Sequence, residues 1–512
     1  MLPKGGLTAI LLVFFVAAWL CSPVSAAPTE EIDQAISDGL AWLVSKQSPD
    51  GYFGQGYDYA LTAKTSFAVL KLEEYAFENG YESPFDPGYK YAQNVTDGLN
   101  YIFSRAVLMD TNEDGTDDAL FFGDHLVYET SIAMMAIGTS EAPDRTVPAL
   151  GMPIDGWTYK KVEQYALNYL IYTQQTNGGW GYHHGMMWSD NSNTGYAVLG
   201  LMYAQNKFGL AIPEAVINSI NNWVDYIQCD DNGGSGYESP CNWVNILKTG
   251  NLLYEMAIVG DTADSARAKV AFSYIENHWS DANWDPGWMG PNWGGESWPD
   301  FQATYTMMKG FEAMDIKEIN VSGTKIDWYD QVSTVIVNSQ NTDGSWNHTS
   351  WGDKLLSTEW ALLTLEKTVE IPVIDVSVDI NPGSCPNPLN LKEKGVLPVA
   401  ILGTAEFNVT DIDPMSLKMS REGVEGAVVP SIRWSYEDAA TPFEGELCNC
   451  HNLKGDGYSD LTLKFDAQAL VGTLELGKVA GTTVPLILTG NLKEEYGGTS
   501  IKGQDCIRVS KK

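Results

Sequence analysis

Two recurring motifs divide most of this chain into six similar segments. The first motif is a pair of adjacent aromatic or apolar residues. In four of the six copies, a Gln follows five residues after the first residue of the pair. Three copies end almost identically in Asp or Asn, Gly and an aromatic residue, at 47–53, 174–180 and 340–346. The second motif is a threonine followed by apolar residues at helical spacing, at Thr65, Thr130, Thr194, Thr249, Thr304 and Thr358. Such recurrence predicts six copies of one supersecondary unit.

Each unit is expected to be two helices joined by a turn. Asp or Asn with Gly supplies the unusual backbone angles of the turn, and Gln can bond exposed backbone groups. One hairpin cannot bury both of its apolar faces, whereas six hairpins in a ring leave no open ends. The sequence therefore predicts a mainly α fold, an (α/α)6 toroid of six helical hairpins around a cavity. An open helical superhelix is the alternative.

The turns resemble the aromatic-Leu-x-x-x-Gln-x-x-x-Gly-x-Trp repeats of the squalene cyclase and protein prenyltransferase superfamily. The resemblance covers about residues 30–370 and is strongest in the first, third and sixth copies. It implies the α/α toroid. It says much less about chemistry.

The catalytic motifs that this resemblance would bring are missing from the sequence. A squalene-hopene-like cyclase uses Asp-x-Asp-Asp, and neither Asp117-Asp118 nor Asp230-Asp231 forms it or the diphosphate-binding Asp-Asp-x-x-Asp. Prenyltransferases hold zinc through Asp, Cys and His, and His183-His184 has no nearby residues to complete such a set. A terpenoid cyclase-like enzyme is therefore only the third expectation.

The ends of the chain indicate export and a second domain. Residues 1–26 have the positive start, apolar run and small-residue cleavage site of a signal peptide, and the apolar run is short for an uncleaved membrane anchor. No later segment looks transmembrane. The toroid is expected at 27–371. At 372–512 the residues alternate as in β-strands and many of them are β-branched, which predicts a smaller all-β, sandwich-like domain. This region resembles a module that recurs at the C-termini of secreted microbial proteins.

Cysteines and sequons agree with a secreted or cell-surface protein. Six cysteines remain after the signal peptide, and an even count in an exported chain fits three disulfides. Cys229 is expected to pair with Cys241, whereas the pairing among Cys385, Cys448, Cys450 and Cys506 stays open. A zinc site at Cys448, Cys450 and His451 is the alternative. Glycosylation sequons begin at Asn94, Asn320, Asn347 and Asn408.

Charge excludes some partners. The formal net charge is −35, and residues 27–374 hold 17 Lys and Arg against 47 Asp and Glu, a balance of −30. Such a field repels nucleic acid and anionic membranes, and it favours solubility or cation binding.

One acidic segment predicts a calcium site. Oxygen side chains at positions one, three, five and nine, with Gly at position six, match the start of an EF-hand-type loop. The predicted ligands are Asp110, Asn112, Asp114 and Asp118, with Gly115 at the sharp turn, but no Glu follows at position twelve. A solvated acidic turn is the alternative. No organic cofactor is expected.

Five tryptophans between 279 and 298 give the best hint of a ligand. Flat rings beside carboxylates suit sugars, because pyranose faces stack on indoles and a carboxyl pair can act as acid and base. The candidate binding residues are Trp284, Trp288, Trp293 and Trp298, and the weaker catalytic candidates are Asp285, Glu296 and Asp300. The alternative is a long turn that wraps itself in aromatic side chains.

Function is therefore expected to be binding of a glycan or a cell-surface protein, without an identifiable catalytic motif. An extracellular carbohydrate-active enzyme, either a glycosidase or a polysaccharide lyase, is the second expectation.

Overall fold

The computed structural model describes most of the chain beyond the predicted signal peptide. The described residues are 27–56, 58–124, 126–291, 297–348, 352–367, 373–392, 394–405, 407–421, 424, 427–443, 445, 447–449, 453–493 and 500–510. Residues 1–26 and the predicted domain boundary at 371–372 lie outside these ranges. So do Trp293, Glu296, Cys450 and His451.

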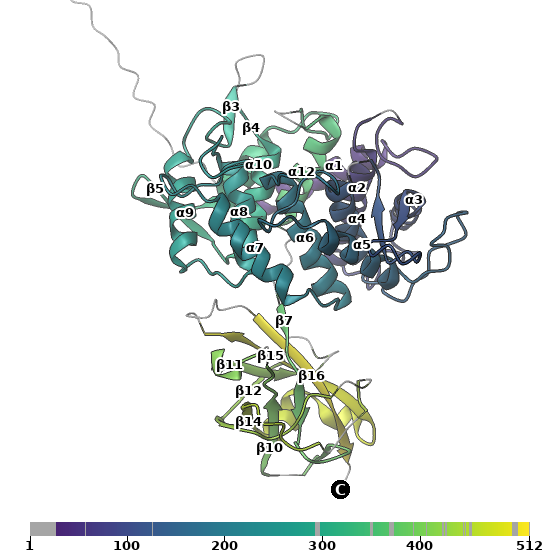
Figure 1. Cartoon of the computed structure of the whole chain (residues 1–512), viewed down its shortest axis with the longest axis vertical. Helices are drawn as coiled ribbons and strands as arrows, with labels where there is room; N and C mark the ends of the chain where they lie inside the picture. Colours follow the sequence, from purple (N-terminus) through teal and green to yellow (C-terminus); the bar gives the residue numbers. More distant parts are fainter. Residues whose placement is uncertain are drawn as a thin grey trace, which may run out of the picture.

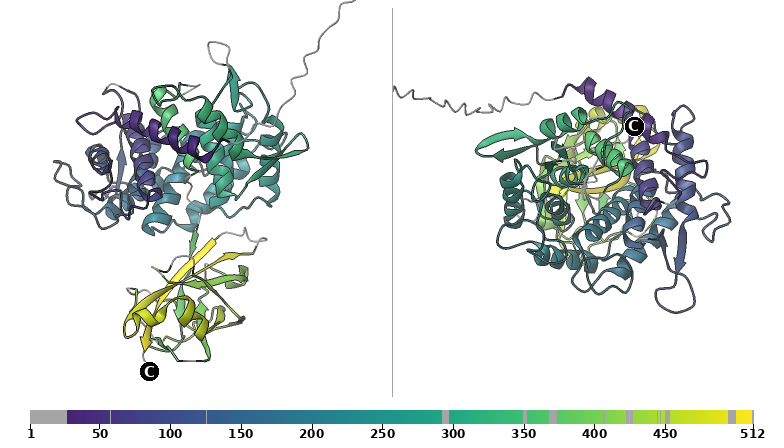
Figure 2. Two further views of the ribbon diagram at one scale, coloured as in Figure 1. Left: turned by 180° about the vertical axis from the view of Figure 1, so that it is seen from behind. Right: turned by 90° about the horizontal axis from the view of Figure 1, so that it is seen from above.

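An inner circle of helices closes on itself. Each inner helix contacts the next one, and the last contacts the first. Figure 2 shows this ring from above. Most residues of these helices are buried, because neighbours cover them on several sides. The inner helices are α2 (Leu61–Glu78), α4 (Leu126–Thr139), α6 (Asn191–Phe208), α8 (Ile246–Ile258), α10 (Phe301–Ala313) and α12 (Lys354–Glu366).

An outer layer of helices packs against this circle. In α7, for example, Val216, Ile220, Trp223, Val224 and Ile227 are buried, a spacing that puts them on one face of the helix. The outer helices are α1 (Thr29–Val44), α3 (Ala92–Ser104), α5 (Tyr159–Thr173), α7 (Glu214–Ile227), α9 (Ala266–His278) and α11 (Trp328–Asn338). The predicted α-helical toroid is confirmed.

Five of the six recurring threonines bind the turn to the inner helix that follows it. Thr194 Oγ1 accepts a hydrogen bond from the backbone N–H of Trp180 at 2.8 Å. The same contact joins Thr65 to Phe53, Thr130 to Phe122, Thr249 to Ser235 and Thr358 to Trp346. A buried N–H without an acceptor is costly. The threonine hydroxyl supplies that acceptor, because no group of the turn itself does so.

The recurring glutamines link neighbouring hairpins. Gln174 Nε2 donates to the carbonyl of Gly178 in its own turn and to that of Val216 in the next outer helix. Gln47, Gln228 and Gln340 repeat this pattern. Gly178 has a φ of +89°, and a Cβ there would lie 1.7 Å from the carbonyl oxygen of Ser219. Only glycine allows the turn to approach the next helix so closely.

Short hairpins are inserted between the helices. They pair β1 (Ala106–Met109) with β2 (Ala119–Phe122), β3 (Met289–Pro291) with β4 (Ser297–Pro299), and β5 (Glu318–Val321) with β6 (Thr324–Asp327). All three pairs are antiparallel, and they lie at the periphery of the ring (Figures 1 and 2).

A separate β-rich domain follows α12, with its own hydrophobic core. One sheet has the order β13–β14–β10–β8, and the other has the order β12–β11–β15–β16–β7, with β9 also on β16. The strands are β7 (Val373–Asp375), β8 (Val378–Ile380), β9 (Pro388–Asn390), β10 (Val396–Ile401), β11 (Ile412–Ser420), β12 (Val429–Pro430), β13 (Arg433–Glu437), β14 (Asp460–Asp466), β15 (Thr483–Leu492) and β16 (Ser500–Ser510). In Figure 1 this domain lies below the toroid, and β7 is the strand nearest to the toroid.

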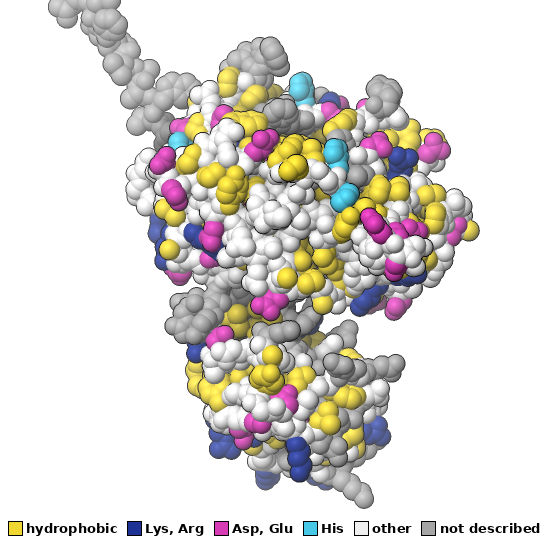
Figure 3. All heavy atoms as spheres, viewed as in Figure 1, with side chains coloured by type: hydrophobic (Ala, Val, Ile, Leu, Met, Phe, Trp, Pro, Cys, Tyr) yellow, Lys and Arg dark blue, Asp and Glu magenta, His cyan; other side chains and the backbone are white. Residues whose placement is uncertain are grey.

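The surface of the toroid carries acidic side chains, and basic ones gather at the far end of the β-rich domain (Figure 3). This agrees with the uneven charge of the sequence. Among the described residues, none of the helices has the length and apolar character needed to span a bilayer.

Candidate functional site

A cavity of about 590 Å³ opens where the inner helices begin. The first turn of every inner helix contributes to its wall, and the connecting turns add aromatic side chains. The lining residues are Tyr59, Ala60, Lys64, Tyr128, Tyr182, Ser192, Tyr237, Trp243, Asn245, Leu247, Lys248, Gln302, Asp353, Leu356 and Trp360. The β-rich domain is attached at the opposite end of α12, so the chain connection leaves this opening free.

Capping side chains occupy the helix ends around the cavity. Asp190, Asn245, Asp300 and Asp353 are the N-cap residues of α6, α8, α10 and α12, and each accepts a hydrogen bond from a first-turn backbone N–H. These bonds satisfy N–H groups that a helix cannot satisfy internally. The three aspartates also place carboxyl groups at the positive ends of α6, α10 and α12.

One wall of the cavity is a chain of aromatic and hydroxyl groups. The hydroxyls of Tyr182 and Tyr237 lie 3.2 Å apart, and Ser192 Oγ lies 3.4 Å from the Tyr237 hydroxyl. The ring of Tyr237 packs edge-on against Trp243, whose side chain is 42% exposed. Burial raises the pKa of Tyr237 well above its ordinary value. Tyr237 therefore stays neutral, and all three hydroxyl groups can donate or accept hydrogen bonds.

Lys248 is the most unusual side chain of the cavity. It is only 3% exposed, and its Nζ lies 4.0 Å from the centroid of the Trp243 ring. Burial lowers the pKa of Lys248 to about 7, although the charges of Asp285 and Asp300 oppose the shift. Within the part of the chain that the structure describes, its amine has neither a hydrogen-bond acceptor nor an ion-pair partner.

Lys64 lines the cavity too, but its charge is compensated. Its Nζ lies 2.5 Å from Asp353 Oδ2 and 3.7 Å from Asp58 Oδ2. Asp353 is the only carboxylate among the described residues that line the cavity. Because this carboxylate already pairs with Lys64, the wall lacks the two free facing carboxyl groups that a glycosidase normally needs.

The described tryptophans of the segment 279–298 pack mainly against one another. Trp288 is 3% exposed, its Nε1 donates to the carbonyl of Trp279, and the two rings lie 5.1 Å apart. Trp284 Nε1 donates to the carbonyl of Trp298, and both side chains are partly buried. The expectation of a sugar-stacking surface is therefore corrected for Trp288, which belongs to the core, and the segment largely packs upon itself.

Asp285 and Asp300, the two catalytic candidates among the described residues, reach the cavity only indirectly. Asp285 Oδ2 accepts a hydrogen bond from Trp243 Nε1 at 2.9 Å, so it holds a cavity residue in place. Asp300 is 5% exposed and caps α10. Neither lines the cavity, and both act on Lys248 through their charge. Trp293 and Glu296 lie outside the described residues.

The acidic loop 110–118 connects β1 and β2, not two helices. Its carboxylates bond the loop's own backbone: Asp110 Oδ2 accepts from Gly115, and Asp118 Oδ1 accepts from Thr111. Asn112 and Asp114 accept from Asp114 and Thr116 in the same way. Calcium binding here stays a prediction.

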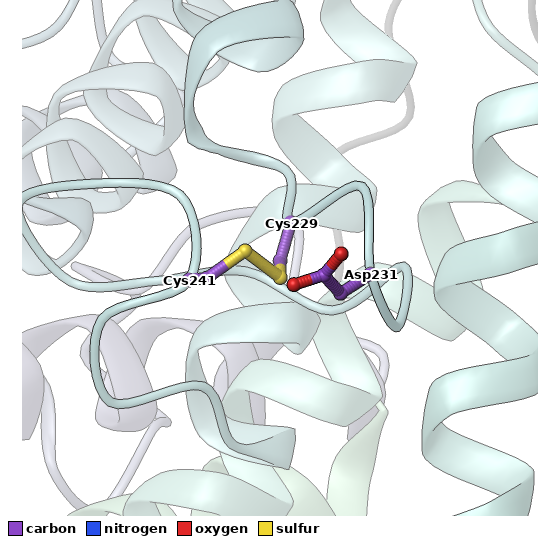
Figure 4. Close-up of side chains that lie close together, drawn as sticks. All are labelled: Cys229, Asp231 and Cys241. Carbon is purple, nitrogen blue, oxygen red and sulfur yellow. A yellow bond between two sulfur atoms is a disulfide. The ribbon is translucent and has the colours of Figure 1, made fainter.

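Two disulfides are formed among the described cysteines. Cys229 and Cys241 are joined as expected, and Cys448 is joined to Cys506. Cys385 is disulfide-bonded too. Asp231 lies beside the first bridge (Figure 4), but sulfurs in a disulfide are not the thiolates that metals require. The bridge at Cys448 removes a ligand from the alternative zinc site. Disulfides of this kind are typical of an oxidising compartment.

Sequence reasoning missed Lys248, Trp243 and Tyr237. A signal was available for Lys248, because it directly precedes the recurring threonine Thr249, as Lys64 precedes Thr65. That position lies in the first turn of an inner helix, and in these two copies its lysine lines the cavity. The aromatic residues come from turns that differ in length between repeats, so no motif marks them.

Comparison with known proteins finds no matching family model and no matching curated protein. Among solved structures, the chain is similar to the type II terpene cyclase MstE from Scytonema, with 11% identity, a TM-score of 0.40, and coverage of 66% of this chain and 96% of that one. It is also similar to a D-mannose isomerase, with 11% identity, a TM-score of 0.42, and coverage of 67% of this chain and 99% of that one. The glycoside hydrolase family 76 mannosidase Bt3792 from Bacteroides thetaiotaomicron VPI-5482 has 12% identity, a TM-score of 0.42, and coverage of 66% of this chain and 97% of its own. Because these identities and TM-scores are low, the evidence for the toroid is the set of helix contacts within this chain.

Proposed function

We propose that this is an exported saccharide-binding protein whose ligand occupies the cavity at the N-terminal ends of the inner helices. The proposal includes a ring of six hairpins, a sandwich-like β domain, and secretion or display on the cell surface after removal of residues 1–26. The observation that carries it is the combination, in one cavity, of aromatic rings with hydroxyl, amide and amine groups.

A saccharide suits these walls. Trp243 is partly exposed and offers a ring on which a pyranose can stack, while Ser192, Asn245, Gln302 and the tyrosine hydroxyls can bond sugar hydroxyls. A volume of about 590 Å³ lies within the usual range of small-molecule sites. Tyr237 and Trp243 contact each other, and Asp285 holds the indole N–H, so the aromatic wall is ordered before a ligand arrives.

Lys248 favours a saccharide that carries an acidic group. Its amine faces the cavity without an acceptor among the described residues, and a carboxylate of the ligand would supply one. The acidic surface of the toroid disfavours long polyanions, so a ligand with one or a few uronic acid residues fits better than a highly charged polymer.

The second candidate is a lyase acting on such a uronic acid. An amine whose pKa lies near 7 is suited to remove a proton next to a carboxyl group at neutral pH. We place binding first because the described part of the wall offers no free carboxyl group, and the hydroxyls of Tyr182 and Tyr237 already bond each other. Terpenoid cyclisation comes third, since the sequence lacks the Asp-x-Asp-Asp acid.

Calorimetric titration with matched oligosaccharides tests the proposal. Hexuronic acid oligomers and their carboxyl-reduced, neutral counterparts differ only in charge. We expect the acidic member to bind more tightly, Lys248→Met to abolish this preference, and Trp243→Ala to weaken both members. Lys269→Met, at an exposed lysine paired with Asp264, is the matched control and should change nothing.

Three other results are informative. Equal binding of both members would remove the acidic preference but keep the saccharide, whereas binding of neither would contradict the proposal. Formation of an unsaturated uronic acid product, seen by its ultraviolet absorbance and lost in Lys248→Met, would make the protein a lyase.

A further inference from the structure

A second cavity, of about 300 Å³, lies in the β-rich domain, and it is polar. Asp379 on β8, Asn387 just before β9, and Asp505 on β16 line it together. Pairing of β9 with β16, and contact of β8 with β16 across the two sheets, bring Asp505 to two residues that lie far earlier in the sequence. The first two side chains are almost completely buried, with 4% and 3% exposure.

Two oxygen atoms in this cavity lack a donor. Asp379 Oδ2 and Asn387 Oδ1 are buried and have no hydrogen-bond partner among the described residues. The orientation of Asn387 is fixed, because its Nδ2 donates to Asp505 Oδ2 at 3.0 Å and to the carbonyl of Cys506 at 3.1 Å. Its Oδ1 therefore has to find another partner. Buried acceptors of this kind require a donor or a cation.

Carboxylates gather at this cavity. Asp379 lies near Asp505 and Asp460, and Lys502, the one described cation among the lining residues, is exposed. Asp460 is already satisfied, since its two oxygens accept from the backbone N–H groups of Gly403, Ala439 and Ala440. Asp505 also accepts from the backbone N–H of Ile380. The cavity thus combines two close carboxylates with an amide oxygen.

We propose that Asp379, Asn387 and Asp505 bind a divalent cation, preferably calcium, and that this ion links β8, the segment before β9, and β16. Carboxylate and amide oxygens are the ligands that calcium prefers, and backbone carbonyls or water can complete its shell. The ion would tie together the two sheets of the β-rich domain. It would stabilise that domain, because only the folded chain assembles the three ligands.

Calorimetry of the mature full-length chain tests this site. With calcium in place of chelator, we expect an unfolding transition to rise by several degrees and direct titration to detect the ion. Asp379→Asn keeps the shape of the side chain but removes its charge. It should lose this response, while its transition in chelator should be as high as that of the wild type or higher, because the repulsion with Asp505 is relieved.

Asp114→Ala is the control, since it alters the acidic loop of the toroid but leaves this cavity unchanged. It should retain the response that Asp379→Asn loses. An Asp379→Asn protein that calcium still stabilises as strongly as the wild type would overturn the assignment. So would a wild type that neither binds calcium nor responds to it, which would leave a buried water as the donor.

Discussion

Gln340 Nε2 donates a hydrogen bond of 2.8 Å to the carbonyl oxygen of Ala35, across 305 positions of the sequence. This bond joins the turn of the last hairpin to the first helix of the toroid. The equivalent bonds of Gln47, Gln174 and Gln228 join neighbouring hairpins along the chain. In the other copies this glutamine bond joins one hairpin to the next along the chain. At Gln340 the same bond joins the last hairpin to the first, so the ring is closed and no terminal hairpin has to be capped.

We predict that Gln340→Ala lowers the free energy of unfolding by about 1–3 kcal/mol, because it leaves two carbonyl groups without their donor. Gln93→Ala is the control. Gln93 also makes a hydrogen bond, to Asp97, but it is exposed and joins one helix to itself. Urea unfolding should separate the two variants, and equal losses would show that closure has no special weight.

Thr194→Val should destabilise the protein by about 1–3 kcal/mol, since it preserves the shape but leaves the buried N–H of Trp180 without an acceptor. Thr194→Ser, which keeps the hydroxyl, should recover most of the loss. If both variants behave alike in thermal unfolding, the methyl group and not the hydroxyl explains why threonine recurs.

Two glycines with similar backbone angles should respond differently to alanine. Gly178 and Gly185 have φ values of +89° and +81°, but a Cβ meets the Ser219 carbonyl at the first site and nothing within 4 Å at the second. Gly185→Ala should cost about 1 kcal/mol from backbone strain alone. Gly178→Ala should cost clearly more. Comparable losses would mean that the close approach between hairpins is easily relaxed.

The buried amine predicts how stability depends on pH. The pKa of Lys248 is lowered from 10.5 to about 7 in the folded protein. Between these values the unfolded chain holds more protons, so this group makes stability rise with pH. Below about pH 7 its full cost is present. Lys248→Met should therefore stabilise the protein more at about pH 6 than at about pH 10, as measured by chemical unfolding. The same gain at both values would contradict the shift.

The acidic loop between β1 and β2 gives a separate prediction. If calcium binds there, it should raise the melting temperature through Asp110, Asn112 and Asp114, and Asp114→Ala should reduce that rise. Differential scanning calorimetry in the Asp379→Asn background isolates this loop from the cavity of the β-rich domain. Identical curves with and without Asp114 would leave the loop as a solvated turn whose carboxylates bond only its backbone.

The toroid could be predicted from sequence because its contacts repeat. The contact that Thr194 makes recurs in five of the six copies, and that of Gln174 recurs in four, so the pattern reveals the unit even though a single copy would not. The pairing of Cys229 with Cys241 followed from their proximity in the sequence. The β-rich region was visible from its alternating residues, but the sequence could not reveal the pairing of Cys448 with Cys506, which depends on strand order.

The cavity could not be predicted in the same way. Tryptophans between 279 and 298 drew attention because they are dense, yet density also results when a long turn has to make its own core, as Trp279 and Trp288 do. Tyr237 and Trp243 come from a turn that no motif marks, and a lysine precedes the recurring threonine in only two copies, at Lys64 and Lys248. Which side chains meet at the centre of the ring depends on how each helix is rotated about its own axis. The repeat pattern of the sequence does not reveal these rotations.

The affinity of Lys248 for an acidic saccharide is the most direct test of the account. We would measure the dissociation constant of the best-binding uronic acid oligomer by titration calorimetry at about pH 6 and about pH 8.5, in the wild type and in Lys248→Met. Because the ligand carboxylate needs the ammonium form, whose pKa is about 7 in the free protein, wild-type affinity should fall by about 10- to 30-fold. The variant isolates Lys248 from Asp285, Asp300, Asp353 and Lys64, and its weaker affinity should stay flat. An affinity that is equal at both pH values in the wild type, or that Lys248→Met leaves unchanged, would contradict the proposed site.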